Sequence, residues 1–461
     1  MVSRLLLATE RRAIIGLAGL YASRMLGLFM VLPVLALYAD DLAGATPLLV
    51  GLALGGYGLT QAILQIPFGL LSDRIGRKAV IALGLTLFLL GSVVAAQADS
   101  IGGVILGRCL QGSGAVAAAI MALLADQTRE EVRTAAMAII GLSIGVAFAV
   151  AMVLGPLVAA SFGLAGVFWF TALLAALGLV VLWRLVPRAP RRSRHRDVVL
   201  DRHQLKAILG RSDLLRLNIS IFALHLILMA IFVAVPFRLL AAGIGAAQHG
   251  GVYLAIMALA FVGMVPLVIV AEKKRRMKTV FVAAVASMAT CLLALAMVGS
   301  WWALVALLLG FFTAFNLLEA TLPSMLSKLA PAGAKGTAMG IYSTSQFLGA
   351  FLGGLLGGGL AQHFGYDAVF YGCGVVALVW LAAVWGMPTP RHLASEVVAL
   401  DEETHGDALD TLMERFAEVA GVEDVLVVPD ERVVYLKVDR QQLDSDALAR
   451  VVGARHDHKG V

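Results

Sequence analysis

The chain has 461 residues, of which 60% are hydrophobic and 14% are charged, and its mean hydropathy is +0.90. This composition is far more apolar than that of a soluble globular protein, and it indicates a protein that crosses a membrane several times. The formal net charge of +6 does not indicate a nucleic-acid partner, because the bases lie between apolar segments, where they orient a protein in the bilayer. The three cysteines lie singly in apolar runs, so we expect no disulfide, no metal site and no cofactor.

The N-terminus carries bases and an apolar run, but Glu10, Arg11 and Arg12 interrupt that run and no small-residue cleavage site follows, so we expect no cleaved signal peptide. Beyond these charges, twelve apolar runs are long enough to span a bilayer, which takes about 20 residues. The sequence therefore predicts an all-α polytopic membrane protein with transmembrane helices near residues 13–38, 48–71, 79–97, 101–125, 135–160, 164–186, 214–241, 248–271, 279–298, 301–327, 336–362 and 365–387.

The connections between these runs alternate in charge. Those after odd-numbered runs contain almost no Lys or Arg, whereas those after even-numbered runs are basic. The bases are Arg74, Arg77 and Lys78, then Arg129 and Arg133, the long basic linker, Lys273–Lys278, and Lys328 with Lys335. Because Lys and Arg are concentrated in cytoplasmic loops, we expect both termini to be cytoplasmic and the protein to lie in the inner (plasma) membrane of a bacterium.

One long polar connection, residues 187–213, falls near the middle of the predicted membrane region. Its segment DVVLDRHQLKAIL has the pattern of a short amphipathic helix on the membrane surface. Arg191–Arg196 carry the charge that anionic lipid headgroups attract, but a basic linker between two domains is the simpler interpretation.

An internal repeat supports a domain boundary in this linker. A shift of 199 positions aligns the two halves, placing Pro67 on Pro266, Asp73 on Glu272 and Arg77 on Arg276. Parallel repeats of this kind are typical of two six-helix bundles related by an axis along the membrane normal. We therefore predict one six-helix bundle in residues 1–186 and a second in residues 214–387.

The chain continues after the twelfth run with a different pattern. DALDTLMERFAEVA indicates an amphipathic helix, VEDVLVV and RVVYLKV indicate two strands joined by Pro429 and Asp430, and SDALARVV indicates a second helix. This order predicts a small α+β, ferredoxin-like domain in residues 388–461, a candidate for binding a cytoplasmic ligand or partner. The domain has no cysteine, and we interpret His456 and His458 as solvated residues.

The stretch GLLSDRIGRK, Gly69–Lys78, lies between the second and third runs. Gly69 and Gly76 permit close backbone approach or unusual dihedral angles. Asp73 can accept hydrogen bonds from backbone amides at a helix N-terminus. The cytoplasmic side is favoured by the three bases, Arg74, Arg77 and Lys78.

Together with two further motifs, this stretch resembles the major facilitator superfamily, and within it the drug:proton antiporter group. In LGRCLQGSGA, the helix-four motif with its embedded arginine is matched by Leu106, Arg108, Gln111, Gly112 and Gly114. In GVAFAVAMVLGP, the helix-five antiporter motif is matched by Gly145, Gly155 and Pro156, although Leu157, Val158 and Ala159 replace the glycine pair that usually follows. With its extra C-terminal domain, the chain is most similar to the YajR type of this group.

The resemblance implies a monomeric membrane transporter, not an enzyme, that moves a small molecule with protons across the lipid bilayer by alternating access. It also implies a conformational latch in the outward-open state. In that latch Asp73 would face the N-terminus of helix eleven at Gly336–Gly340, and Arg77 would pair with Asp126 at the end of helix four. The alternative is that Asp73 only caps its own loop.

Ionisable residues inside a membrane are costly and are functional candidates; they are Arg24, Arg108, Asp126, His225 and Glu319. Arg108 lies too deep to reach the interface, so it needs a carboxylate, a carbonyl or a water-filled cavity. Arg24 either snorkels or faces the cavity. Glu319, four residues before Pro323, is the candidate proton carrier. His225 either titrates near neutral pH or is a neutral core histidine.

The candidate residues of a substrate cavity are mostly apolar or amide-bearing: Phe29, Met30, Gln111, Met229, Phe232, Phe315, Asn316 and Gln346. This set favours a hydrophobic or amphipathic solute. Glycines spaced four apart let membrane helices approach closely, and they occur on helices two and eleven, at Gly51 and Gly55 and at Gly349, Gly353 and Gly357. The resemblance places these two helices against each other across the domain interface.

Three functions remain open at this point. Proton-coupled export is favoured by the helix-five motif and by Glu319. Proton-coupled uptake of a metabolite would use the same fold. A membrane sensor that signals through the C-terminal domain belongs to another class and predicts no flux.

Overall fold

The computed structural model of the chain describes residues 7–187, 208, 210–274, 276–330, 335–387, 393–399, 407–428, 433–439 and 442–453. The segment DVVLDRHQLKAIL, except for Ile208, lies outside the described residues, as do Pro429, Asp430, His456 and His458.

The first half of the chain forms long helices joined by short turns. They are α1 (Ala8–Met30), α2 (Leu35–Tyr38), α3 (Pro47–Ile75), α4 (Arg77–Ala96), α5 (Ile101–Ser113), α6 (Ala117–Gln127) and α7 (Glu130–Arg184), with a 3-10 turn at Ala39–Asp41. Local sequence explains their starts: Thr46 accepts a hydrogen bond from the Leu49 amide at 3.3 Å, and Pro47 occupies the first helical position.

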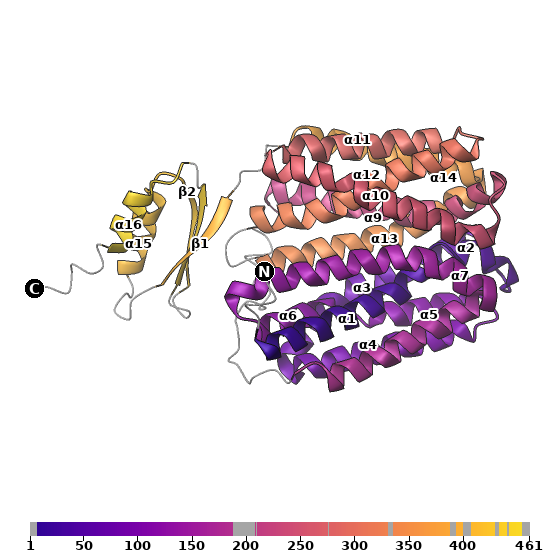
Figure 1. Cartoon of the computed structure of the whole chain (residues 1–461), viewed down its shortest axis with the longest axis horizontal. Coiled ribbons are helices and arrows are strands. Elements are labelled where there is room, and N and C mark those ends of the chain that lie inside the picture. The colour runs from indigo at the N-terminus through magenta and orange to yellow at the C-terminus, as the bar shows by residue number, and fades with distance from the viewer. Residues whose placement is uncertain are drawn as a thin grey trace, which may run out of the picture.

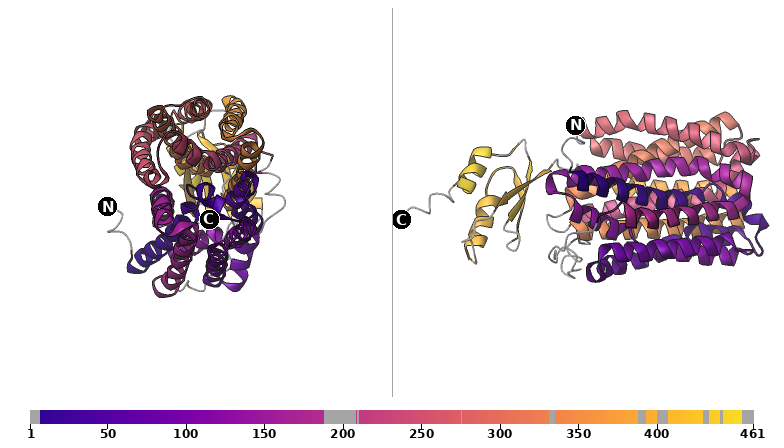
Figure 2. Two further views of the ribbon diagram at one scale, coloured as in Figure 1. Left: turned by 90° about the vertical axis from the view of Figure 1, so that its right-hand side faces the viewer. Right: turned by 60° about the horizontal axis from the view of Figure 1, so that its bottom comes forward.

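The second half repeats this pattern. Its helices are α9 (Ser212–Ala241), α10 (His249–Lys273), α11 (Met277–Leu295), α12 (Trp301–Leu329), α13 (Lys335–Phe364) and α14 (Tyr366–Trp385), with a 3-10 turn at Ala246–Gln248. Figure 1 shows the first-half helices below and most second-half helices above, with α13 between them, and the end-on view in Figure 2 agrees. We call α1–α7 the first bundle and α9–α14 the second bundle.

Helix α7 crosses the membrane region twice. In the described chain, eleven helices are long and apolar enough to span a membrane, and one of them, Ala135–Arg184, has 50 residues. A straight helix of that length would measure about 75 Å, against about 30 Å for a hydrocarbon core. At Gly163 the dihedral angles are φ 66° and ψ −171°, which interrupt the helix. Both ends of α7 lie near the start of α1: Arg129 at one end binds Glu10, and Val186, just after the other end, packs on Gly16.

Divided at Gly163, the eleven candidate spans of the described chain become twelve segments, the number of apolar runs in the sequence. Two predicted helices are interrupted, however. The helix predicted at 13–38 ends at Met30, and a turn containing Pro33, which lacks an amide proton, separates α1 from α2. The helix predicted at 101–125 is broken between Ser113 and Ala117. Apolar runs continue through both breaks, so hydrophobicity alone could not locate them.

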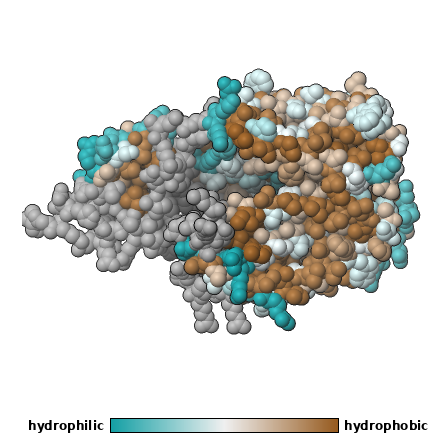
Figure 3. All heavy atoms as spheres, in the orientation of Figure 1, coloured by the Kyte–Doolittle hydropathy of each residue, from teal (hydrophilic) through white to brown (hydrophobic). Residues whose placement is uncertain are grey.

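The helices run along the long axis of the molecule, with two distinct ends (Figure 1). We call the end where α1 begins and α14 stops the terminal end, and the opposite end, where α3 begins, the far end. The face of the helical part seen in Figure 3 is largely apolar. Large apolar side chains such as Phe162, Val262 and Trp302 are about 70% exposed. An apolar exterior of this size fits a lipid environment.

A separate small unit lies beyond the terminal end (Figure 1). It consists of β1 (Leu393–Ala399), α15 (Asp407–Ala417), β2 (Val422–Val428), β3 (Val433–Asp439) and α16 (Ser445–Gly453). The strands form an antiparallel sheet in the order β1-β3-β2, with Ala399 and Val428 both opposite Val433. Alternate β3 residues are buried with Phe416 and Leu448 of the helices, as the two-residue period of a strand requires.

The sequence predicted four of these five elements and missed β1. Its segment LASEVVA is short and contains Ser395 and Glu396, so neither alternation nor an apolar run marks it. The segment becomes a strand because it pairs with β3 over seven residues. That pairing is not visible in the sequence of the segment itself.

Candidate functional site

Three polar side chains from three helices of the second bundle meet within the membrane region. Nε2 of Gln346 on α13 lies 2.8 Å from Nε2 of His225 on α9 and donates to Oε1 of Glu319 on α12 at 3.4 Å. Nδ1 of His225 is 3.3 Å from the Ile221 carbonyl oxygen. Because the amide donates to Nε2, this geometry describes a neutral imidazole whose proton is on Nδ1 and is donated to Ile221.

The polar cluster His225–Glu319–Gln346 is partly open and has unused hydrogen-bonding capacity. The Glu319 side chain is 38% exposed, and its Oε2, 3.8 Å from His225 Nε2, has no hydrogen-bond partner among the described residues. The amide nitrogen of Asn316 on α12 and the hydroxyl of Tyr342 on α13 are buried and also lack a partner in the described chain. The cluster can therefore accept a proton or a polar group without first breaking an ion pair of Glu319.

Aromatic rings connect this cluster to the first bundle. The ring of Phe315 is 6.1 Å from that of His225 and 5.8 Å from that of Phe148 on α7, and Phe148 is 5.1 Å from Phe29 on α1. Phe29 and Phe315 are cavity candidates from the sequence, whereas Phe148 lies in a uniformly apolar run that does not mark it. The three phenylalanines form an apolar wall across the bundle boundary.

The other cavity candidates differ in burial. Phe29 and Gln346 are partly exposed, but Met30, Gln111, Met229 and Phe232 are fully buried. Gln111 donates to the Ser92 hydroxyl at 2.9 Å inside the first bundle. In this conformation, the four buried residues do not line an open surface.

Arg108 is fully buried and is satisfied by neutral oxygens. It donates to the carbonyl oxygens of Ala53 at 3.1 Å and Leu54 at 3.3 Å and to Oε1 of Gln111 at 2.9 Å. Its guanidinium also lies over the Tyr57 ring, 4.6 Å from the centroid. Of the three kinds of partner that the sequence allowed, the structure supplies carbonyls.

Arg24 does not snorkel, so that alternative is wrong. Its side chain is fully buried and donates to Gln61 Oε1 at 3.1 Å and to the Gly114 carbonyl at 2.9 Å, in the break of helix four. The guanidinium lies 5.4 Å from the centroid of the Phe88 ring. The sequence analysis missed Gln61, although Gln61 and Gln65, four apart in an apolar run, are a signal that could have identified it.

The segment Gly69–Lys78, which ends α3 and begins α4, holds an ion-pair network at the terminal end. Arg77 pairs with Asp73, its Nε lies 3.4 Å from Asp126 Oδ2, and it donates to the Ser72 hydroxyl at 2.6 Å. Asp126 therefore lies where the latch hypothesis requires it. Asp73, in contrast, pairs inside its own bundle in this conformation.

The remaining loop residues shape the junction of α3 and α4. Gly76 has φ 100°, a region that favours glycine, and separates the two helices. Gly69 faces α6, and Arg74 is exposed. Lys78 donates to the Val186 carbonyl at the end of α7.

The two bundles touch closely in the far half of the molecule. A β-carbon placed on Gly51 of α3 would lie 2.1 Å from the Gly354 carbonyl oxygen of α13, and one on Gly55 would lie 2.7 Å from that of Phe351. The Leu48 amide also donates to Gln362 Oε1 at 3.2 Å. The resemblance implies contact between helices two and eleven. These are α3 and α13, and they are in contact.

The glycines of α13 serve two different neighbours. Gly349 and Gly353 do not face α3: β-carbons there would lie 2.2 Å and 2.1 Å from the carbonyl oxygens of Phe222 and Leu226 on α9. The spacing of the glycines predicted that α13 has a face of small residues. It could not predict which helix that face contacts, because Gly354 and Gly358, one position later, form a second such face.

The helix-five motif lies where α7 meets two other helices. Gly155 allows contact with the end of α1, since a β-carbon there would lie 2.4 Å from the Met30 carbonyl oxygen. Pro156 lies beside Gly250 of α10 in the second bundle, and Gly145 faces Phe261 of the same helix.

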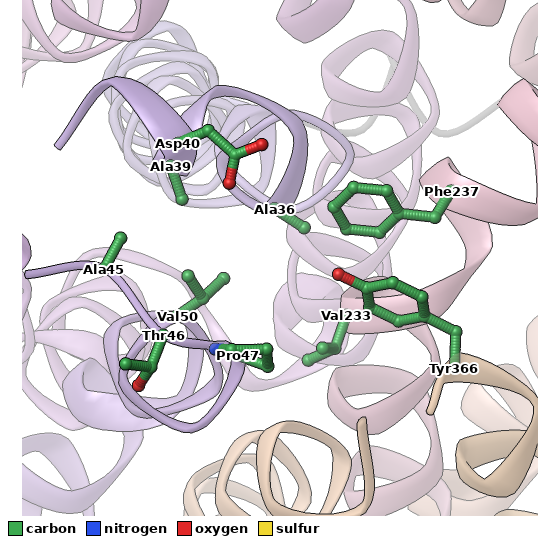
Figure 4. A pocket seen from close by; sticks show the side chains of 10 residues that line it. All are labelled: Ala36, Ala39, Asp40, Ala45, Thr46, Pro47, Val50, Val233, Phe237 and Tyr366. Atoms are coloured by element: carbon green, nitrogen blue, oxygen red, sulfur yellow. The ribbon is translucent and has the colours of Figure 1, made fainter. Parts of the chain in front are cut away.

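A small pocket separates the bundles at the far end (Figure 4), and Phe237 and Tyr366 stack on its second-bundle side at 4.3 Å. Its first-bundle wall consists of Ala36, Ala39, Asp40, Ala45, Thr46, Pro47 and Val50. At the terminal end, Figure 3 shows a hollow between the two bundles. The close contacts between the bundles thus lie in the far half, and the hollow lies toward the terminal end.

The comparisons with known proteins agree with this architecture. Residues 17–354 and 279–412 match the Major Facilitator Superfamily. The chain belongs to the major facilitator superfamily. The superfamily consists of transporters, so this chain is a transporter of that family and not an enzyme.

Among its relatives, the inner membrane transport protein YajR of Escherichia coli K12 is 48% identical over 436 residues, which cover 93% of this chain and 94% of YajR. Two solved structures of the superfamily have the same fold. A D-xylose-proton symporter has a TM-score of 0.66 at 16% identity and covers 83% of this chain and 98% of its own. A bacterial homologue of the lysosomal transporter Spinster, in an inward-facing and occupied conformation, has a TM-score of 0.67 at 13% identity and covers 82% and 97%.

Proposed function

We propose that this major facilitator protein is a monomeric, proton-coupled secondary transporter of the bacterial inner membrane that exports a small hydrophobic or amphipathic molecule by alternating access. The observation that carries the proton coupling is the cluster of His225, Glu319 and Gln346. A carboxylate inside a membrane is costly and is therefore a functional candidate. Glu319 lies beside a titratable imidazole and has no cationic partner among the described residues.

The cluster suggests how one proton changes local contacts. In the neutral state, Gln346 donates to both His225 and Glu319. A proton on Glu319 makes its carboxyl a donor, and a proton on His225 Nε2 removes the acceptor that Gln346 uses. Either event requires α9, α12 and α13 to exchange hydrogen bonds, which ties protonation to the packing of the second bundle.

The distribution of bases supports the orientation. Arg74, Arg77, Lys78, Arg129 and Lys328 all lie at the terminal end of their helices, and basic loops remain in the cytoplasm. With the terminal end in the cytoplasm, the hollow faces inward and the close contact of α3 with α13 seals the outer side. The apolar wall of Phe29, Phe148 and Phe315 then favours an apolar solute body.

Replacing the proposed proton carrier tests this function. Glu319→Gln keeps the size of the side chain and removes its charge change, so we expect folding and substrate binding to persist while flux driven by a pH gradient is lost. Flux is measured in proteoliposomes at equal protein content, with Asp99→Asn, a change in an exposed far-end turn, as the matched control. Normal gradient-driven flux in Glu319→Gln would rule out this carrier.

The direction of transport needs a separate measurement. Export is favoured by Gly145, Gly155 and Pro156, although the altered sequence after Pro156 departs from the antiporter pattern. Flux in inverted and right-side-out vesicles with the same imposed gradient separates export from uptake, because only antiport moves solute against the proton flow.

A further inference from the structure

The first bundle contains a buried cation with unused donors. Arg24 is fully buried, and only its Nη2 donates, to Gln61 and to the Gly114 carbonyl. Its Nε and Nη1 have no hydrogen-bond partner within the described residues, and neither does the amide nitrogen of Gln61. These three N–H-bearing atoms belong to side chains that are already in contact. Because a buried donor without an acceptor is costly, these atoms are candidates for binding an acceptor.

An anion would satisfy these donors and also offset positive charge that neutral oxygens leave in place. Arg108 is a second fully buried guanidinium in the same bundle, and its contacts with protein oxygens are all to neutral groups. The described carboxylates of the first bundle lie at helix ends or in connections: Glu10, Asp40, Asp41, Asp73, Asp99 and Asp126. Two positive charges in a low-dielectric interior are therefore uncompensated by the described side chains, which charges inside a membrane rarely are.

Tyr57, one helical turn before Gln61 on α3, lies at the bundle boundary. The Arg108 guanidinium lies over the Tyr57 ring, and that ring is 6.5 Å from the ring of Phe347 on α13. Beside it, a β-carbon on Gly58 would lie 2.6 Å from the Phe347 carbonyl oxygen. Here the contact of α3 with α13 covers Tyr57. Separation of these helices at the far end, which alternating access requires, would uncover Tyr57 and the face of α3 that also carries Gln61.

We propose that Arg24 and Gln61 form a binding site for a monovalent anion of carboxylate type, which Arg24 Nε, Arg24 Nη1 and the Gln61 amide hold by hydrogen bonds. The anion is either a free small ion or the acidic group of the transported solute. The second case rests on the proposed transport function, whereas the binding site itself does not.

Thermal unfolding of the full-length chain in detergent tests binding, with sodium acetate as the probe and constant ionic strength. A ligand that binds only the folded state raises the unfolding temperature with concentration, so we expect a rise that saturates. Arg24→Gln should abolish it, and Arg184→Gln, which removes an exposed arginine at the end of α7, should preserve it. An equal acetate effect in Arg24→Gln would overturn the proposal.

Gln61→Glu provides a second variant that retains Arg24. Its carboxylate would lie where Gln61 Oε1 now accepts from Arg24 at 3.1 Å, and would supply the missing negative charge from within the chain. We expect a higher unfolding temperature without acetate and no further rise with acetate. A Gln61→Glu protein that still responds to acetate as the parent does would contradict the anion site even if Arg24→Gln fails to fold.

Flux separates the two sources of the anion. The solutes compared are a fluorescent amphiphile with a carboxylate and its methyl ester. If Gln61→Glu transports the ester but loses the acid, the solute supplies the anion. If both move as in the parent while the acetate response is lost, the anion is a free ion. If neither solute moves in the parent, transport of these amphiphiles fails, but the unfolding result still decides whether the anion site exists.

Discussion

Glu10 shows at the scale of one residue how a charge can join two helices. Its side chain is 3% exposed and accepts from the Arg129 side chain at 2.9 Å and 3.1 Å, from the Arg129 amide at 3.0 Å and from the Leu7 amide at 2.9 Å. The carboxylate thereby caps the start of α7 and ties it to α1. The sequence identified Glu10 only as an interruption of an apolar run.

Removing this carboxylate should destabilise the first bundle. Glu10→Ala leaves the Leu7 and Arg129 amides without their acceptor, and we expect a loss of about 0.5–2 kcal/mol of unfolding free energy, because a capping carboxylate is lost while both donors stay exposed to water. Denaturant unfolding in detergent measures the loss. Asp41→Ala, at an exposed far-end turn, serves as the control, and equal stability of the two variants would show that the contact contributes nothing.

For the buried arginines, the sequence predicts that a polar partner is needed but does not predict which residue supplies it. Membrane depth correctly required a polar partner for Arg108 and made Arg24 a candidate. The partners themselves come from residues distant along the chain: Gly114 is 90 positions from Arg24, and Ala53 is 55 from Arg108. Such pairs depend on how helices pack, which the periodicity of a single run does not contain.

At the scale of elements, α13 has two neighbours with different roles. Gly353 packs on α9 inside the second bundle, and Gly354 packs on Gly51 of α3 across the boundary. The sequence predicted a small-residue helix from the spacing of four but could not assign the faces, since glycines occupy both adjacent positions.

Adding one methyl group at each position should separate these roles. Gly353→Ala overpacks the second bundle, so we expect it to lower stability by about 1–3 kcal/mol. Gly354→Ala pushes the bundles apart at the far end, so we expect far-end opening with much less loss of bundle stability. Labelling of single cysteines at both ends reports the state, and Gly359→Ala, which meets only Leu48 at 3.9 Å, is the control. An unchanged labelling pattern in Gly354→Ala would contradict this assignment.

At the scale of the whole molecule, the number of crossings could be predicted because span length and apolarity are fixed by the bilayer. The conformational state could not, because the same sequence must be stable in two arrangements. In the structure, the close contacts of α3 with α13 lie in the far half, and Asp73 at the other end of α3 pairs with Arg77 of its own bundle.

The C-terminal unit lends itself to a test of independence. We propose that its βαββα order is a ferredoxin-like module attached to a self-sufficient transporter. Removing residues 393–461 deletes β1 together with its partner β3, so no unpaired strand remains. We expect the truncated chain to insert, unfold at a similar temperature and transport. Failure to insert would show that the module is part of the membrane core.

The latch hypothesis predicts a contact of Asp73 that forms only when the terminal end closes. In the conformation open at the far end, closure at the terminal end would bring Asp73 of α3 to the start of α13 at Gly336–Gly340, where free amides and the positive end of the helix attract a carboxylate. Arg77, already held by Asp126 at 3.4 Å, would keep Asp73 in place. Asp73→Asn keeps the side-chain shape but loses the charge, so it should favour the terminal-end-open state described here and slow transport.

Asp73→Glu, which retains the charge on a longer side chain, should keep part of the activity and is the matched control. Single cysteines placed at each end report the two states, and solute flux is measured on the same proteoliposomes. Because the Asp73–Arg77 pair exists in the present state as well, loss of that local pair alone would change stability without changing which end is labelled. An Asp73→Asn protein with the parent's labelling pattern and transport rate would leave Asp73 as a local cap of its own loop.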